Sequence, residues 1–412
     1  MKTSTILLLV CSLSFLSLNA GKAKDFEKKL DRAEVLFKNG NFSDALKMYL
    51  DLYSVDSTNA NVCYKIGVCY MKAGKGNDPK KAAVYLEKSV KGAHKLYDEN
   101  DRKEKRAPLS SYKLLAEAYH LNYDFDKAIN TYKQYQKAAR LDRKSEKDIT
   151  RRIGMCETGK ELMAHPADVK IVNLGKTINS TYPDYSPRLS ADQSTMIYTS
   201  RRPENTGGKT YDGGQYFEDI YIATRKDGQW QSTNIGWPIN TVGNEAAIGI
   251  SADGQEILIY KDDMGDGNIY SSRLDGDKWS TPAKLNSNIN SQYWEPSAFL
   301  SADGNTLFFV SDRPGGFGGT DIYKSTRSPG GDWGKAENLG PTINSPFDEH
   351  SPYIHPDGVT LFFSSKGHKT MGGYDVFFSH TLLSDDKIWI EPTNVGYPIN
   401  TPGDDAFYMV ST

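Results

Sequence analysis

The distribution of apolar residues divides this chain into two regions with different periods. In residues 24–165, apolar side chains recur at the three- and four-residue spacing of a helix, whereas residues 169–412 contain short apolar runs separated by glycine, proline and aspartate. The clearest part of the second region is Ser301–Arg327, in which two strand-like runs, Leu307–Val310 and Asp321–Ser325, flank a glycine cluster. The sequence therefore predicts a multidomain α + β chain, with an α-helical domain followed by an all-β domain.

The second region is built from one repeat, because three positions recur at fixed offsets and a tryptophan recurs ten or eleven residues before the asparagine of the next Ile-Asn pair. An Ile-Asn pair ends at Asn179, Asn240, Asn290, Asn344 and Asn400. Five residues after each asparagine stands an acid: Asp184, Glu245, Glu295, Glu349 and Asp405. Eight residues beyond the first four acids stands a turn aspartate: Asp192, Asp253, Asp303 and Asp357. A tryptophan marks the expected last strand of each copy: Trp230, Trp279, Trp333 and Trp389.

Each copy holds four strand-like runs in roughly fifty residues, which is typical of a β-propeller blade. Residues 169–412 are thus predicted to form four complete blades and a partial fifth that begins at Asp405. Val169–Leu174 resembles a last strand that would join the incomplete blade. Either an abbreviated fifth blade closes the ring, or the sequence is a fragment of a longer protein; the break inside a repeat slightly favours the fragment.

The helical region contains its own repeat. Small and aromatic residues at equal offsets predict helical hairpins in which two helices approach closely: Ala33, Leu36, Ala45, Tyr49 and Leu52 correspond to Ala116, Tyr119, Ala128, Tyr132 and Tyr135. A third hairpin is expected to pair Gly67 and Tyr70 with Ala82 and Leu86, and Ser145–Met163 is expected to form a capping helix. These offsets resemble the tetratricopeptide repeat, although its signature tryptophan is absent. The domain boundary is expected near His165–Pro166.

The first twenty residues predict an export signal. Lys2 precedes the apolar run Ile6–Leu18, which is too short to span a bilayer as a helix, and cleavage is expected after Ala20. No later stretch is apolar enough to cross a membrane, so we expect an exported periplasmic protein that is soluble or peripherally attached.

Composition excludes some functions. A formal net charge of −2 provides no basic field for nucleic acid. Cys63, Cys69 and Cys156 remain after the signal, and an odd number does not indicate a disulfide framework, so we interpret them as small buried side chains.

The acids of the repeat are the one candidate site. In a propeller, the loop that enters the innermost strand lies at a mouth of the channel, so the five acids are predicted to form a ring there: Asp184, Glu245, Glu295, Glu349 and Asp405. Crowded carboxylates favour a cation or a partner's lysine or arginine. The alternative is that each acid accepts backbone N–H groups and so fastens neighbouring blades.

Other motifs indicate no catalytic or cofactor-binding residue. The Asp-Gly pairs are explained by tight turns that need a positive φ. Asp262–Asn268 has alternating oxygen side chains, as a calcium loop would, but lacks the closing glutamate. We interpret it as a solvated hairpin loop and expect no cofactor, with calcium weakly supported.

The string SADG, LFF, SDR, GG and DIY within Ser301–Tyr323 resembles the PD40 or WD40-like repeat of TolB-type propellers. Together with the export signal and the helical hairpins, it resembles the PorE-like envelope proteins of the Bacteroidetes type IX secretion and gliding machinery. Members of that family usually continue into an OmpA-type domain that this sequence lacks, so peptidoglycan binding is not carried over.

The resemblance implies a non-enzymatic scaffold whose partners are envelope or secretion-system proteins, attached to the outer membrane through them. The alternative is a glycan-binding or glycan-active propeller, which the many Tyr and Trp residues would serve. An enzyme would need a pair of carboxylates in one blade alone, whereas the acids found are common to all copies.

Overall fold

A computed structural model describes residues 25–74, 77–211, 214–262, 265–382 and 385–410. The chain forms two compact units, Met1–Lys160 and Glu161–Thr412. The first is α-helical and the second consists of four antiparallel sheets, which confirms the predicted fold class. The predicted export signal in residues 1–20 lies outside the described residues. Among the described helices, none is both long and apolar enough to cross a membrane.

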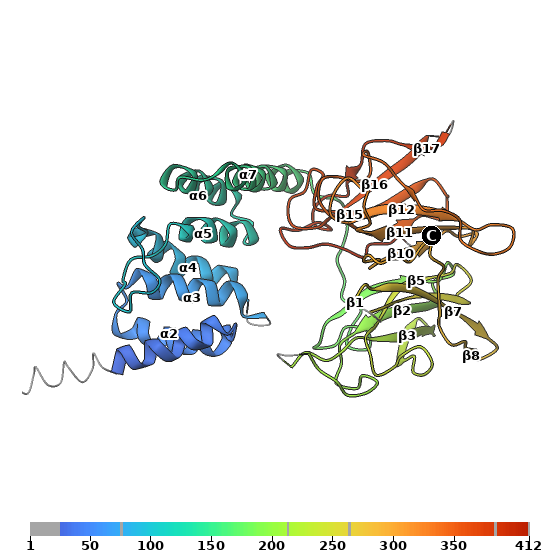
Figure 1. Cartoon of the computed structure of the whole chain (residues 1–412), viewed down its shortest axis with the longest axis horizontal. Coiled ribbons are helices and arrows are strands. Elements are labelled where there is room, and N and C mark those ends of the chain that lie inside the picture. Colours follow the sequence, from blue (N-terminus) through green and yellow to red (C-terminus); the bar gives the residue numbers. More distant parts are fainter. Residues whose placement is uncertain (1–24, 75–76, 212–213, 263–264, 383–384, 411–412) are drawn as a thin grey trace, which may run out of the picture. The chain divides into compact units, whose positions relative to one another are not determined.

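The helical unit is a row of consecutive helices, each packed on the next (Figure 1). A helical stretch over residues 25–38 comes first. The helices that follow are α2 (Phe42–Val55), α3 (Ala60–Lys72), α4 (Pro79–Ser89), the 3-10 turn η2 (Val90–Gly92), α5 (Ser110–Leu121), α6 (Phe125–Ala138) and α7 (Arg143–Ala164). The last of them packs on α5 and α6: Arg152 pairs with Glu117 at 3.1 Å, and Gly159 lies against the ring of Phe125.

Small residues permit this close packing, as the hairpin pattern predicts. Ala33, Ala45, Ala116 and Ala128 are fully buried. A Cβ atom on Gly67 in α3 would lie 2.5 Å from side-chain carbons of Leu86 in α4, so only glycine fits this contact. The cysteines predicted to be buried are indeed buried and free: Cys63, Cys69 and Cys156.

Replacing Gly67 by alanine is expected to destabilise the helical unit by about 1–3 kcal/mol, because the added methyl group forces α3 and α4 apart. Gly154→Ala in α7 is the matched control. A Cβ atom there meets nothing within 4 Å, so alanine should stabilise by up to about 1 kcal/mol. Urea unfolding followed by circular dichroism at 222 nm measures both changes; equal effects at the two positions would contradict the packing argument.

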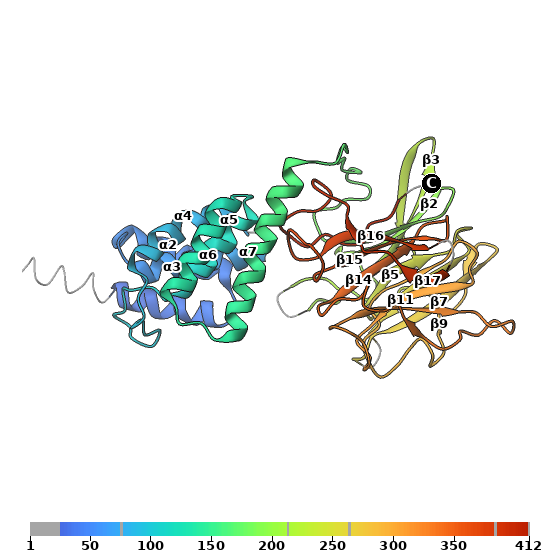
Figure 2. The same cartoon turned by 90° about the horizontal axis from the view of Figure 1, so that it is seen from above.

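The second unit is a four-sheet β-propeller, seen from two directions in Figures 1 and 2. The first sheet comprises β1 (Asp184–Leu189), β2 (Thr195–Ser200), β3 (Asp219–Lys226) and β4 (Gln229–Asn234). The second comprises β5 (Glu245–Ile250), β6 (Glu256–Lys261), β7 (Asn268–Asp275), β8 (Lys278–Trp279) and β9 (Ala283–Lys284). The third comprises β10 (Ala298–Leu300), β11 (Thr306–Ser311), β12 (Asp321–Thr326) and β13 (Glu337–Asn338). The fourth comprises β14 (Glu349–Ile354), β15 (Thr360–Ser365), β16 (Asp375–Leu382), β17 (Asp385–Trp389) and β18 (Thr393–Asn394).

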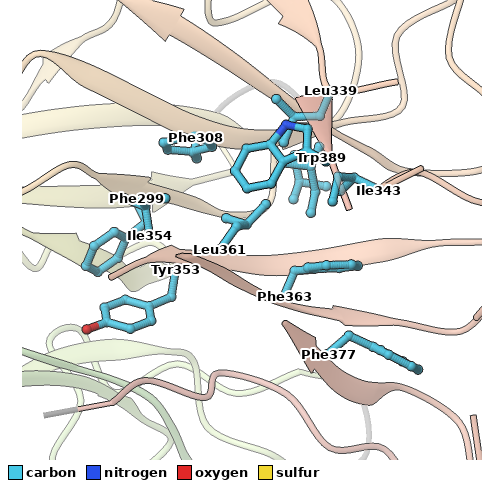
Figure 3. Packing of buried hydrophobic residues seen from close by; sticks show 12 residues of the cluster. Phe299, Phe308, Leu339, Ile343, Tyr353, Ile354, Leu361, Phe363, Phe377 and Trp389 are labelled. Carbon is cyan, nitrogen blue, oxygen red and sulfur yellow. The ribbon is translucent and has the colours of Figure 1, made fainter. Parts of the chain in front are cut away.

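Hydrophobic clusters between successive sheets hold the propeller together. Each cluster joins the apolar runs of one sheet to those of the next. Between the third and fourth sheets, Phe308 and Leu339 meet Leu361, Phe363 and Trp389 (Figure 3). The aromatic and aliphatic runs of the repeat therefore form the interfaces between blades.

The Asp-Gly turns have the predicted conformation. Gly254, Gly304 and Gly358 have φ values of 73°, 72° and 73°, and Gln193, which replaces glycine in the first copy, has a φ of 57°. The turn aspartate accepts hydrogen bonds from neighbouring residues. In the third copy, for example, the Ser301 hydroxyl donates to Asp303 at 2.5 Å. Turn geometry therefore accounts for these aspartates.

The predicted tryptophan lies in an outer strand in three of the four sheets: Trp230 in β4, Trp279 in β8 and Trp389 in β17. Two other features of the outer strands were predicted wrongly. Trp333 lies before the fourth strand of its sheet and forms only an isolated bridge with Arg327, while in the second and fourth sheets the outer strand is split into two short pieces. Val169–Leu174 forms no strand, because the described part of the chain places no third strand beside it. Its apolar side chains are exposed, with Ile171 70% exposed.

Residues 405–410 take the place of a fifth innermost strand without strand pairing. The Tyr353 hydroxyl of β14 donates to the carbonyl of Val410 at 2.7 Å. The ring of Phe407 lies 6.1 Å from that of Tyr185 in β1, measured between centroids. This segment therefore bridges the first and fourth sheets at the channel.

Candidate functional site in the propeller channel

The five predicted site acids occupy equivalent places at the start of the innermost segments. Asp184, Glu245 and Glu349 are the first residues of β1, β5 and β14. Glu295 precedes β10, and Asp405 begins the fifth segment. Glu245, Glu295 and Glu349 are 0% exposed. The structure therefore places all five at one register, as the repeat predicts.

All five carboxylates accept bonds from the residue four positions earlier. Glu349 accepts the backbone N–H of Ser345 at 2.9 Å and its hydroxyl at 2.6 Å. Matching pairs of bonds come from Ser180, Thr241, Ser291 and Thr401. Glu349 also accepts the hydroxyl of Ser365, the last residue of β15, at 2.6 Å. Each acid thus fastens its entry loop. A cation or partner bound at the ring stays a prediction.

The copies differ in how the acid's charge is compensated. Arg202 pairs with Asp184 at 3.2 Å, Lys261 with Glu245 at 3.1 Å, and Arg313 with Glu295 at 3.2 Å. Among the described residues, neither Glu349 nor Asp405 forms an ion pair: the position that corresponds to Arg313 is Gly367 in the fourth copy. Burial therefore raises the pKa of Glu349 to about 7 and raises the pKa of Asp405.

The asparagine of the Ile-Asn pair is a structural residue whose role the sequence analysis missed. Asn344 is 1% exposed. It accepts the backbone N–H of Ile322 at 2.7 Å and donates to the carbonyl of Ile322 at 3.0 Å. Asn240, Asn290 and Asn400 make the same pair of bonds to the third strand of their sheets. The side-chain amide makes the two hydrogen bonds that the backbone of a neighbouring strand would otherwise make to the third strand. The recurrence of this asparagine in every copy was the sequence signal that could have revealed its role.

The channel itself is filled by side chains that differ between copies. At the level just inside the acids, Phe407 contacts His350, with ring centroids 5.6 Å apart. Burial, with the nearby Arg188, lowers the pKa of His350 to about 4, so its imidazole is neutral at pH 7. Toward the Asp-Gly turns lies a cavity of about 40 Å³, lined mainly by apolar side chains that include Phe299 and Tyr353.

Arg188 is the second residue that the sequence analysis missed. It projects from β1 across the channel, where its guanidinium carbon lies 5.7 Å from the ring centroid of Phe299 and 5.9 Å from that of Phe407. The other copies carry Gly249, Phe299, Tyr353 and Met409 at this position. A charge at a position that is otherwise apolar or glycine was the signal that could have revealed it.

One face of the propeller carries exposed apolar side chains. The start of β1 pairs with the end of β2, which pairs with the start of β3, so the loops entering the innermost strands and those joining second to third strands lie on the same face. We call this the acid face. Its exposed large apolar residues are Tyr211, Trp237, Val242, Trp294, Phe317 and Phe347.

Metal ligands do not cluster in the part of the chain that the structure describes: no group of three or more His, Cys, Asp or Glu side chains is placed to hold an ion. The weakly supported calcium loop, Asp262–Asn268, lies partly outside the described residues. Within it, Asp262 accepts the backbone N–H of Gly265 at 2.9 Å, as in an ordinary turn.

Comparison with known proteins finds similarity in the propeller fold alone. No protein-family model matches the sequence, and no curated protein matches it significantly. Among solved structures, TolB from Acinetobacter baumannii has 18% identity and a TM-score of 0.37, over 53% of this chain and 45% of that one. A structure assigned to TolB from Agrobacterium tumefaciens has 15% identity and a TM-score of 0.32, over 55% and 86%.

An α-L-arabinofuranosidase from Lactobacillus brevis is similar to the same degree, with 14% identity and a TM-score of 0.35, over 55% of this chain and 79% of that one. This chain spans less than half of the Acinetobacter structure. Because such different proteins match equally well, the likeness carries no activity over to this chain. The class that the described residues define is an α-helical unit joined to a β-propeller.

Proposed function

We propose that this protein is a non-enzymatic scaffold of the cell envelope that binds other proteins through its helical unit and its propeller. In this proposal the helical unit is a tetratricopeptide-like array, and the partners are proteins of type IX secretion or outer-membrane assembly. It would reside in the periplasm, attached to the outer membrane through those partners. The proposal for location and partners rests on the sequence resemblance alone.

The observation that carries the binding role is the exposed apolar set on the acid face. Trp237 is 78% exposed, Val242 58% and Phe317 49%. Large apolar side chains gathered on one face of a folded unit are typical of protein-interaction surfaces, in which aromatic residues supply most of the binding energy. The carboxylates common to all copies are engaged in local bonds to their own entry loops.

The test is a pull-down from envelope membranes with the full chain as bait. We expect identified envelope or secretion-system proteins to be recovered with the wild type, and the double variant Trp237→Ser, Phe317→Ser to bind them at least about tenfold more weakly. Leu382→Ser is the matched control: Leu382 is 40% exposed but lies at the far end of β16, away from the acid face. It should bind as the wild type does.

Two results would overturn the proposal. One is recovery of no envelope component together with hydrolysis of glycans or peptides by the purified chain, which would favour the glycan-active alternative. The other is equal binding by the acid-face variant and the wild type, which would remove the acid face from the interaction.

A further inference from the structure

Arg188 is a buried cation that lacks a counter-charge. Its side chain is 0% exposed, and only Nε donates a hydrogen bond, to the carbonyl of Ile248 at 3.0 Å. Nη1 and Nη2 have no hydrogen-bond partner. Among the described residues, no carboxylate forms an ion pair with it, whereas three of the five acids at the channel mouth, Asp184, Glu245 and Glu295, are each paired with a cation.

The charge cannot be removed by losing a proton at neutral pH. Burial lowers the pKa of Arg188 to about 10, which still leaves the guanidinium protonated. Phe299 and Phe407 lie within cation–π range of its guanidinium carbon. Aromatic rings interact with the faces of the planar guanidinium group, whereas the N–H donors of that group point outward within its plane. The rings therefore leave the N–H donors of Arg188 without hydrogen-bond acceptors. An isolated buried charge is strongly unfavourable unless an opposite charge accompanies it.

Serine occurs two residues after the repeat acid in three copies, at Ser186, Ser297 and Ser351, all of them buried. The Ser186 hydroxyl, on the same strand as Arg188, donates to the carbonyl of Ala247, and the Ser351 hydroxyl shares a hydrogen bond with Nδ1 of His350. Neither side chain brings a negative charge to Arg188, so its two unpaired Nη groups are best compensated by an anion.

We propose that the propeller channel binds a small monovalent anion, such as chloride or formate, at Nη1 and Nη2 of Arg188. The anion is a free ion, because a fully buried guanidinium is out of reach of a side chain on another protein. Arg188 is contributed by the first copy, Phe299 by the third and Phe407 by the fifth segment. The anion would therefore neutralise the charge at the point where these segments meet.

The test is thermal unfolding of the full chain while sodium chloride replaces sodium gluconate at constant ionic strength, since gluconate is too large for the site. All six tryptophans lie in the propeller, so their fluorescence follows that unit. We expect the Tm of the wild type to rise by several degrees with chloride and then to saturate, because an anion that binds only the folded state stabilises it. Arg188→Met should abolish this rise.

Arg225→Met, which alters an exposed arginine at the end of β3, is the matched control and should keep the wild-type response. Bromide soaked into crystals of the wild type should give an anomalous peak in contact with the Arg188 guanidinium. The proposal is overturned if chloride affects the wild type and Arg188→Met alike, or if bromide leaves no peak at Arg188. Should Arg188→Met fail to fold, the bromide result on the wild type decides.

Discussion

Replacing Asn344 by alanine is expected to lower the free energy of unfolding of the propeller by about 2–4 kcal/mol. Asn344 is buried, and its amide makes both bonds to the backbone of Ile322 and a third to Asn338 at 2.9 Å. The carbonyl of Ile322 keeps a bond from Leu339, but its N–H would be left buried and unpaired. A buried N–H donor that loses its partner costs the full free energy of its desolvation, which exceeds the net contribution of an ordinary hydrogen bond to stability.

Asn305→Ala is the matched control within the same sheet. Asn305 is exposed, and its amide bonds only the turn residue Asp303, at 3.1 Å. Its removal should change stability by less than about 0.5 kcal/mol. Urea unfolding followed by tryptophan fluorescence measures both variants. If Asn344→Ala were as stable as Asn305→Ala, the asparagine would not be acting as a substitute strand residue.

The second large effect is a difference between two acids that the repeat makes equivalent. At pH 8, Glu295→Gln is expected to destabilise the propeller by about 2–3 kcal/mol, because it removes the buried partner of Arg313. Glu349→Gln is expected to stabilise it. The Glu349 carboxylate is equally buried but has no cation, so its ionisation in the folded state is unfavourable.

The sign of the pH dependence follows from the raised pKa. Glu349 has a pKa of about 7 in the folded protein and an ordinary value of 4.5, so the folded state binds the extra proton between these values. The wild type therefore loses stability relative to Glu349→Gln as the pH rises from about 4.5 to 7, by up to about 3 kcal/mol. Below pH 4.5 the two should be nearly equal, since a protonated carboxyl and an amide offer similar bonds.

Unfolding of the wild type and both variants at pH 4.5, 6 and 8 measures this difference. Comparing each variant with the wild type cancels the contribution that other groups with raised pKa values, such as Asp375, make to the pH dependence of stability. A Glu349→Gln variant that is destabilised at pH 8 as strongly as Glu295→Gln would show that the two acids are compensated alike.

Much of the fold was predictable because the same pattern of strands and turns occurs in several copies along the sequence. The apolar runs Leu307–Val310 and Leu361–Phe363 fall within β11 and β15, and the residue after the turn aspartate has a positive φ in every complete copy. The outer strands were predicted less well. Trp333 and Val169–Leu174 have strand-like sequences, but a strand also needs a neighbour to pair with, and that depends on the sheet rather than on the segment.

The candidate site was also predicted in part. The ring of acids and the Ile-Asn pairs were visible because they recur at fixed offsets. Arg188 was missed, because the search followed residues that recur, whereas Arg188 differs from the residues at the same position of the other copies. Its neighbours Phe299 and Phe407 follow it by 111 and 219 positions, so only closure of the propeller brings them together.

The sequence by itself determined the features that recur in each copy: the helical hairpins, the turns, and the register of acid and asparagine, which depend on bonds and contacts within one hairpin or one blade. The tertiary structure decided which charges are compensated. Glu295 and Glu349 have the same local bonds, yet Arg313 reaches only the first of them. Desolvation depends on everything that surrounds a group, so the contrast between these acids, and the uncompensated charge of Arg188, appear only when the sheets are assembled.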